Sequence, residues 1–370
     1  MYLIKQIVAI ILSIFEIISP FVVQVFTDSG ESMMYEWSAS MEFTESHYIE
    51  INKHPDEDFK ILNLTDIHIF DDDIYHEGGI GEDCLALVSQ TIEDQKPDLI
   101  TVSGDSFCST LSTLKLIKLI DSYEIPWAPV LGNHDGGNVG KWVFWAAYHL
   151  SKAKYSLFEF GPKGMGYGNY IINITENGNI IHSLYLMDTH NTMVDYIVEG
   201  EIIPGYDHLW ENQIAWYEWA VQGNERLAGH RVQSTVILHG SLYEQKVAWQ
   251  NVATDEKTLD APLGNLKPEY SHIVSGHSGE YGGYPPISNG FFDKVKELGS
   301  TKDIITGHDH LNDYSIVYEG VRLTYALKTC SSDYYREDML GATVYTINSE
   351  GQTHIGHVYY TFSNGKWITR

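Results

Sequence analysis

Basic residues are scarce in this 370-residue chain: 23 Lys and Arg stand against 50 Asp and Glu, giving a formal net charge of −27. So negative a surface repels DNA, RNA and anionic lipid at long range. We therefore exclude nucleic-acid binding through a basic patch. A small anionic substrate remains compatible with the sequence only if metal cations dominate the field at its site.

Cysteine is also scarce, with only Cys84, Cys108 and Cys330, and their separations are long. There is no zinc ribbon or CxxC motif, and an odd count excludes a fully paired disulfide framework. We expect all three to be buried as small hydrophobic side chains, with one disulfide as the alternative. Hydrophobic residues make up 43% of the chain, which predicts a sizeable packed core.

One long apolar run, residues 7–26, follows Lys5 and is interrupted by Glu16 and Pro20. About 20 residues suffice to span a bilayer. The positive-inside rule puts the rest of the chain outside the cytoplasm. We expect a secreted or membrane-anchored protein that contacts a membrane only through this run, if it is uncleaved. A buried N-terminal helix is the alternative.

The rest of the chain divides by its residue patterns. We expect residues 1–29 to be a signal peptide or membrane anchor, and residues 30–57 to be a spacer with one short strand. Residues 58–370 form the expected catalytic domain. Within it, a helical stretch is expected over residues 136–168 and a surface insertion near the site over residues 254–286, and we expect these two segments to set specificity.

Apolar runs alternate with helical patterns from residue 59 onward. Strands are expected in residues 59–66, 97–105 and 126–133, and helices in residues 82–95 and 111–123. This βαβαβ order predicts parallel strands buried on both faces. Further on, a Glu-Asn-Gly-Asn turn predicts a hairpin, and the C-terminal tail reads as antiparallel strands.

Short polar motifs follow five of the expected strands: Asp66-Ile67-His68, Gly104-Asp105, Gly132-Asn133-His134-Asp135, His239-Gly240 and Gly307-His308-Asp309-His310. Because sites in α/β sheets form at the carboxyl ends of strands, we expect all five to converge. Asp, His and Asn without thiolates suit a pair of divalent ions. Two ions about 3.5–4 Å apart can share a hydroxide and clamp an in-line displacement at phosphorus.

The ordered set D-x-H, G-D, G-N-H-D, H and G-H-x-H, spanning residues 66–310, resembles the calcineurin-like metallophosphoesterases. The stretches WAPVLGNHD, YGNYIINI and YDHLWENQIAWYEWA look like the plant and fungal purple-acid-phosphatase-like phosphatases. In the true purple enzymes a tyrosine stands three residues after the G-D motif, where this chain has Cys108. The resemblance therefore implies the family site without the tyrosinate ligand.

The resemblance also implies a role for each motif residue. One metal would be held by Asp66, His68 and His310. The other would be held by Asn133, His239 and His308, with Asp105 bridging the two. His134 would stabilise the phosphoryl group or protonate the leaving oxygen, with Asp135 fixing its ring. A histidine suits the acid role because its pKa lies near working pH.

Four further residues and one acidic run are secondary candidates. Asp309 is either a support for the ligands or a solvated carboxylate, and Glu244 either lines the cleft or lies on the surface. His277 and Glu280 are expected to be polar loop residues. The acidic run at residues 71–73 lacks the spacing of a calcium loop and is expected to be solvated.

We therefore predict a four-layer α-β-β-α sandwich of two mixed sheets flanked by helices. The predicted activity is hydrolysis of phosphate monoesters by a metal-bridging hydroxide, with a small phosphorylated molecule or a phosphoprotein as substrate. The two divalent or trivalent ions would be Mn, Fe, Zn or similar. A phosphodiesterase for nucleotides or lipid head groups is the first alternative, and a non-catalytic scaffold on the same fold is the second.

Overall fold

A computed structural model describes residues 30–370 except 75–78, 137–142, 191 and 364. The expected signal or anchor segment, residues 1–29, lies outside the described residues. Within the described part, no helix is long and apolar enough to cross a membrane.

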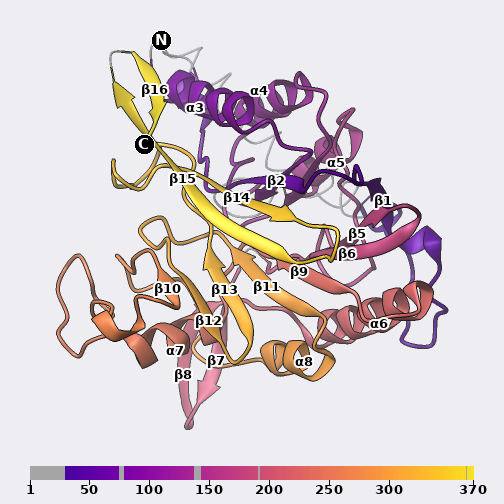
Figure 1. The fold of residues 1–370 in the computed structure, drawn as a ribbon. Helices are drawn as coiled ribbons and strands as arrows, with labels where there is room; N and C mark the ends of the chain where they lie inside the picture. The colour runs from indigo at the N-terminus through magenta and orange to yellow at the C-terminus, as the bar shows by residue number, and fades with distance from the viewer. Residues whose placement is uncertain (1–29, 75–78, 137–142, 191, 364) are drawn as a thin grey trace, which may run out of the picture.

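Two large sheets lie face to face at the centre of the molecule (Figure 1). The six-stranded sheet has the order β16 (Lys366–Thr369), β15 (Thr353–Ser363), β14 (Gly341–Ile347), β2 (Phe59–Leu64), β3 (Leu99–Ser103) and β4 (Trp127–Val130). The eight-stranded sheet has the order β1 (Ile49–Asn52), β5 (Tyr170–Glu176), β6 (Asn179–Leu186), β9 (Gln233–Ile237), β11 (Thr301–Thr306), β13 (Val321–Tyr325), β12 (Ser315–Tyr318) and β10 (Val274–Ser275).

Helices cover the outer face of each sheet. The six-stranded sheet carries α3 (Ile80–Gln95), α4 (Thr110–Asp121) and α5 (Val143–Lys152), and the eight-stranded sheet carries α6 (Glu211–Ala228), α7 (Tyr243–Val252) and α8 (Phe291–Leu298) (Figure 1). The short elements are η1 (Glu45–His47), α2 (Asp71–Ile74) and η2 (Pro268–Tyr270). The predicted four-layer sandwich is therefore confirmed.

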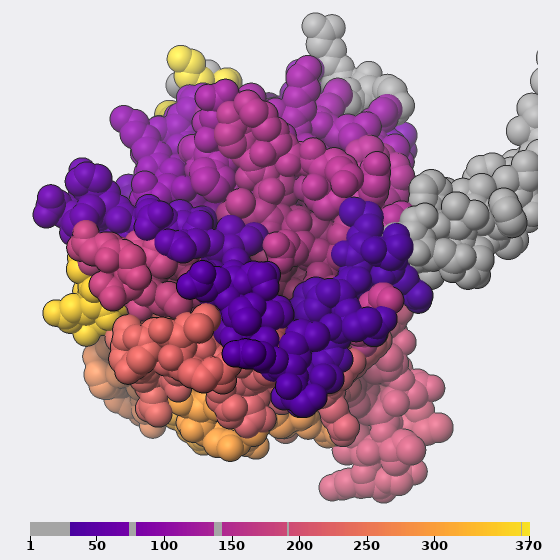
Figure 2. Space-filling model, turned by 90° about the vertical axis from the view of Figure 1, so that its right-hand side faces the viewer, coloured from indigo at the N-terminus to yellow at the C-terminus, as the bar shows by residue number. Residues whose placement is uncertain are grey.

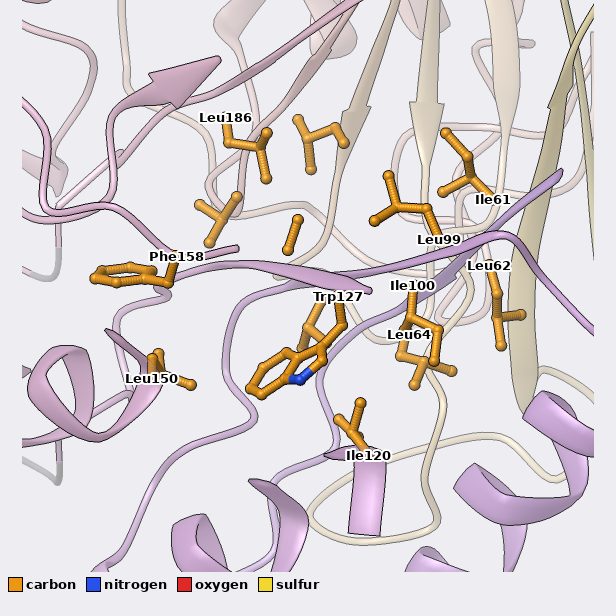
Figure 3. Close-up of a cluster of buried hydrophobic side chains, with 14 of the residues drawn as sticks. Ile61, Leu62, Leu64, Leu99, Ile100, Ile120, Trp127, Leu150, Phe158 and Leu186 are labelled. Carbon is orange, nitrogen blue, oxygen red and sulfur yellow. The ribbon is translucent and has the colours of Figure 1, made fainter. Parts of the chain in front are cut away.

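Apolar side chains explain this layering. Every residue of β3 is buried, as expected for a central strand covered on both faces, and β2, β3 and β4 pair in parallel. Trp127 of β4 packs among side chains that include Ile120 of α4 and Leu150 of α5 (Figure 3). Leu186 of β6 belongs to the same cluster, so one core joins the two sheets.

Several expected elements are present, and some differ. The β5–β6 hairpin and the antiparallel β14–β15 pair are confirmed. The helix expected over residues 136–168 is shorter: α5 ends at Lys152, and Gly161, Gly164, Gly166 and Gly168 beyond it have positive φ. In the tail, β13 is antiparallel to β12 but parallel to β11.

The segment 30–57, expected as a spacer, is part of the fold. Its expected strand is present as β1, which pairs in parallel with β5 at the edge of the eight-stranded sheet. Phe43 is buried in the second core cluster, where its ring lies 4.9 Å from that of Trp219 on α6. Apolar burial therefore fixes this segment to the body.

Two features depart further from expectation. Cys84 and Cys330 form a disulfide with a Cα–Cα distance of 5.2 Å, so only Cys108 remains as the expected buried free thiol. The pairing joins α3 to a loop 246 residues further along the chain, a proximity that spacing alone could not reveal. A two-stranded hairpin of β7 (Met193–Val198) and β8 (Glu201–Tyr206) also projects from the body (Figures 1 and 2).

Candidate metal centre

The first group of ligand-type side chains is formed by Asp66, His68 and His310, all buried. The first two follow β2, and His310 follows β11. The Nε2 atoms of His68 and His310 are 3.1 Å apart, and Oδ1 of Asp66 lies 3.7 Å from the first and 3.5 Å from the second. Three donors thus face one point.

The second group is formed by Asp105, His239 and His308, also buried. They follow β3, β9 and β11. Nδ1 of His308 lies 3.2 Å from Nε2 of His239, and Oδ1 of Asn133 lies 3.0 Å from that same nitrogen. The predicted ligand Asn133 is therefore in place beside the second group.

Asp105 lies between the two groups. Its Oδ2 atom is 3.4 Å from Nε2 of His68 and 3.3 Å from Nε2 of His239. All seven predicted ligand residues therefore come together at the carboxyl ends of the strands, as expected. This arrangement suits two ions that share one carboxylate.

The residues present fit such ions. Oδ1 of Asp66 is buried and has no hydrogen-bond partner among the described residues, and a buried carboxylate oxygen without a partner is costly unless a cation meets it. Nδ1–H of His239 donates to the Ser103 carbonyl and Nδ1–H of His310 donates to the Tyr334 carbonyl, both at 2.9 Å. These bonds leave each Nε2 as the free ligand atom.

The electrostatics also favour cations. Burial opposes ionisation of Asp105, yet His239 and His68 hold its pKa well below the usual range. Burial likewise opposes protonation of His239, but Asp105 raises its pKa to about 10. A bound cation would take over the balancing of these carboxylates, and coordination by Nε2 of His239 requires that nitrogen to be unprotonated.

The backbone at these loops is unusual. Asp66, His68, Asp105 and His308 all have positive φ, a conformation that residues with a Cβ seldom adopt. Gly104, Gly132 and Gly307 leave room beside them, because a Cβ at each would collide with His239, Asp105 or Thr65. Such strain persists only where the surroundings enforce it, as they do in a ligand cluster.

A family model described as "Calcineurin-like phosphoesterase" matches residues 59–312. The chain belongs to the calcineurin-like phosphoesterase family. The predicted resemblance and the metal-dependent phosphoesterase class are thus confirmed at the level of the family.

Relatives include "Phosphatase DCR2" of Saccharomyces cerevisiae, 32% identical over 184 residues that cover 43% of this chain and 31% of that protein. "Probable inactive purple acid phosphatase 14" of Arabidopsis thaliana is 26% identical over 313 residues, covering 72% of this chain and 69% of that protein. A "dimetal phosphatase from Danio rerio LOC 393393" matches in structure with a TM-score of 0.42 and 11% identity, covering 80% of this chain and 98% of that one.

The sequence predicts that Asp135 fixes the ring of His134, but in this phosphoesterase the Asp135 carboxylate binds backbone instead. Its Oδ1 accepts the N–H groups of Ser106 and Phe107, at 2.8 and 2.5 Å, and its Oδ2 accepts that of Gly132 at 2.8 Å. With both oxygens turned to backbone, Asp135 ties the Gly104 loop to the Gly132 loop. The N–H of His134 donates to Oδ1 of Asp105 at 2.6 Å, which holds His134 at the rim.

A cavity of about 460 Å³ opens over the metal centre. Its lining includes His134 and, beyond the predicted ligands, Tyr206, Glu280, Tyr281 and Tyr334. The insertion at residues 254–286 therefore borders the site as expected, whereas no described residue of 136–168 lines the cavity. Tyr206 was missed by sequence reasoning, and its ring meets that of His308 edge to face at 4.4 Å.

A second missed feature is the support segment, residues 328–334, which lies under the Asp66 loop. Nζ of Lys328 donates to the Asp66 carbonyl at 2.6 Å, and Oγ of Ser332 donates to the Ile67 carbonyl at 2.5 Å. Thr329 exchanges two 3.0 Å hydrogen bonds with the backbone of Thr65. The disulfide at Cys330 joins this segment to α3.

The remaining candidates separate clearly. Oδ1 of Asp309 accepts the Gly283 N–H at 2.7 Å, so Asp309 supports the ligand loop. Oε1 of Glu280 accepts the Leu311 N–H at 2.6 Å, so it is more than a loop residue. Glu244 is buried on α7 but does not line the cavity, and His277 is exposed beside Asp313. Asp71 caps α4 by accepting from Leu111 and Ser112.

Proposed function

We propose that this protein hydrolyses phosphate monoesters at a two-metal centre formed by the seven ligand residues. The single observation that carries the proposal is the position of Asp105, whose Oδ2 lies within 3.4 Å of His68 in one group and 3.3 Å of His239 in the other. When bound, two ions would neutralise the phosphoryl oxygens and activate the attacking water. Mn, Fe and Zn all suit His, Asn and carboxylate donors.

His134 is the proposed proton donor to the leaving oxygen. It borders the cavity, and its ring centroid lies 5.1 Å from that of His68. Its backbone N–H is fixed by Asp105, so the carboxylate that joins the two groups also positions the acid. Asp135 assists indirectly, because its carboxylate holds the two loops on which Asp105 and His134 lie.

The cavity wall supports a substrate drawn in by the metal ions rather than by protein cations. The described lining residues include Glu280, Asp309 and Asp333 but no Lys or Arg. Such a wall repels phosphate unless the ions supply the attraction. The similarity to the yeast phosphatase favours a phosphatase, and the complete ligand set together with His134 argues against a non-catalytic scaffold.

The acidic wall also keeps a diesterase as the second candidate, because a diester carries less negative charge than a monoester. The deciding experiment compares p-nitrophenyl phosphate with bis-p-nitrophenyl phosphate, using wild type, Asp105→Asn and His134→Ala, and measures bound metal. We expect Asp105→Asn to lose metal and more than about 100-fold in activity. His134→Ala should keep the metal and lose about 100- to 10,000-fold in kcat.

Matched control variants are Asp260→Asn and His230→Ala, both on exposed side chains away from the cavity lining. They should leave turnover and metal content unchanged. Wild-type turnover in both Asp105→Asn and His134→Ala would refute the mechanism. A higher kcat/KM for the diester would replace the monoesterase with the diesterase.

We further propose that the protein works outside the cytoplasm, secreted or membrane-anchored, with membrane contact only through residues 7–26 if they are uncleaved. The apolar run after Lys5 supports this location. The Cys84–Cys330 disulfide supports it independently, because disulfides persist mainly in oxidising compartments.

A further inference from the structure

The hairpin of β7 and β8 begins in the catalytic cavity. Tyr206, the last residue of β8, lines that cavity with its ring against His308. From there the two strands run outward beyond the rest of the body (Figures 1 and 2). The hairpin therefore forms a continuous surface that leads away from the metal centre.

One face of this hairpin is exposed and mostly apolar. Tyr206 is paired with Met193, and Ile202 with Ile197. Directly paired residues and alternate residues along a strand share a face, so these side chains lie on the same side as Pro204. Ile197 is 76% exposed, Ile202 70% and Met193 58%. We define the hairpin face as Met193, Asp195, Ile197, Ile202, Pro204 and Tyr206, with the Asp195 carboxylate as its one charged member.

The opposite side fixes the orientation of the hairpin. Tyr196 is buried, and its hydroxyl donates to the Tyr206 carbonyl at 2.6 Å and lies 2.9 Å from Nδ1 of His208. Gly205 packs close to the ring of Pro286, where a Cβ would lie 2.7 Å from Cδ. These contacts hold the base of the hairpin from behind and leave Met193, Ile197 and Ile202 on the hairpin face exposed.

The exposed pair Ile197 and Ile202, with Met193 on the same face, favours contact with another apolar surface. Ile202 stands four residues from Tyr206, roughly 13 Å along the strand. A substrate with its phosphate at the metal centre would reach Ile202 only if the rest of the molecule were long and extended. It would also need apolar groups spaced along its length to contact the hairpin face. An extended polypeptide has those properties, since alternate side chains share a face.

We propose that the hairpin face docks an extended phosphorylated polypeptide whose apolar residues lie about four to six positions from the phosphorylated one. This inference rests on the proposed phosphatase activity, because the phosphate must occupy the metal centre. The negative charge of the hairpin further restricts which peptide sequences can bind. The hairpin carries Asp195, Glu199 and Glu201, and the described cavity lining has no Lys or Arg, so neutral or basic flanks fit better than acidic ones.

A membrane lipid is a poorer occupant. Inserting the hairpin into a bilayer would bring Glu199 and Glu201, at its turn, into the interface. The net charge of −27 adds repulsion from anionic lipid. A peptide avoids both costs, because it lies along the hairpin face without burying the turn.

The test uses phosphoserine 14-mers with Ile at positions four and six from the phosphoserine, on its N-terminal or C-terminal side, and matched peptides with Ser or Glu there. The variant is Ile197→Thr/Ile202→Thr, which keeps β-branched side chains on an exposed hairpin. The matched control is Val317→Thr/Ile368→Thr, exposed strand residues outside the hairpin. We measure kcat/KM for each peptide relative to p-nitrophenyl phosphate, and peptide binding by fluorescence anisotropy.

In wild type and the control variant, one Ile peptide should exceed its Ser counterpart about tenfold in relative kcat/KM and in affinity. The hairpin variant should lose that gain. Equal binding of the Ile and Ser peptides, or a gain that survives in the hairpin variant, would overturn the inference. So would hairpin-dependent hydrolysis of phosphatidate vesicles without the peptide effect, or a hairpin-dependent dimer in sedimentation.

Failure of wild type to hydrolyse p-nitrophenyl phosphate with metal bound would count against the proposed function alone. The anisotropy measurement does not require turnover, so the docking inference stands or falls separately. Tighter binding of the Glu peptides than of the Ser peptides would refute the charge argument and with it the proposed partner.

Discussion

The ammonium group of Lys328 donates a 2.6 Å hydrogen bond to the backbone carbonyl of Asp66. Both residues are buried, and Asp66 has a positive φ. The Lys328 ammonium group therefore binds backbone beneath the metal centre, and Lys328 is not among the residues that line the cavity. Its burial lowers the pKa of Lys328 to about 8, although the Asp66 carboxylate opposes that shift. Burying an ammonium group costs free energy, so its presence here indicates that the Asp66 loop needs this hydrogen-bond donor.

Replacing Lys328 with Met should therefore weaken the centre without removing a ligand. The Asp66 carbonyl would lose its donor, and its left-handed turn would lose support. We expect metal affinity to fall about 10- to 100-fold, the usual effect of removing a group that orients a ligand. Metal titration followed by thermal unfolding measures the change. Lys118→Met, on an exposed part of α4, should have no effect, and an identical loss there would contradict the explanation.

The convergence of the seven predicted ligand residues could be predicted from the sequence, whereas the groups that support them could not. Asp66, Asp105 and His239 each follow an apolar strand, and parallel strands present their carboxyl ends together. Lys328 and Asp66 are 262 residues apart and meet across the two packed sheets, because Lys328 follows β13 of one sheet and Asp66 follows β2 of the other. Tyr206 could not be predicted because it lies on a hairpin with largely exposed residues, whose sequence lacks the alternation of apolar and polar residues that marks a half-buried strand. Asp135 shared a motif with His134, but its carboxylate turned to backbone amides instead.

The disulfide should be measurable directly. Unfolded protein should show one reactive thiol, Cys108, before reduction and three after it. A count of three before reduction would show that Cys84 and Cys330 are unpaired. The bond closes a long loop, so Cys84→Ser/Cys330→Ser should lower the free energy of unfolding by about 2–5 kcal/mol. Because Cys330 lies in the support segment, metal affinity should fall too, and added reductant should not change the double variant further.

Acid should destabilise the fold through His182, a buried residue of β6 remote from the metal ligands. Burial lowers the pKa of His182 to about 4. Its Nδ1 atom lies 2.8 Å from the Gly351 carbonyl oxygen, and its Nε2 atom lies 3.0 Å from Oγ1 of Thr235. The unfolded histidine has a pKa of about 6.5. The folded state thus binds fewer protons, and its stability is full above pH 6.5 and declines as the pH falls towards 4.

The size of this effect follows from the difference in pKa. About 2.5 units correspond to roughly 3 kcal/mol of unfolding free energy. Between pH 6.5 and 4, His182→Gln should reduce the slope of the unfolding free energy against pH by the equivalent of up to one bound proton. The amide keeps a donor and an acceptor but does not titrate. Denaturant unfolding at several pH values measures the slope. His230→Gln, on an exposed side chain, is the control, and an unchanged slope in His182→Gln would contradict the assignment.

Gly104 links backbone shape to metal binding most directly. Its φ is +93°, and a Cβ added there would collide with the ring of His239. That ring lies beside both Asp105 and Asn133, so moving it would disturb the second group of ligand-type residues. Gly104→Ala should therefore lose metal affinity as well as stability. Gly178→Ala is the matched control, since Gly178 has a φ of +78° but open space around it. Left-handed strain alone costs of order 1–3 kcal/mol at either position. Calorimetric metal titration separates the two effects: Gly178→Ala should bind metal as wild type does, and normal binding by Gly104→Ala would show that the His239 ring can move without cost to the site.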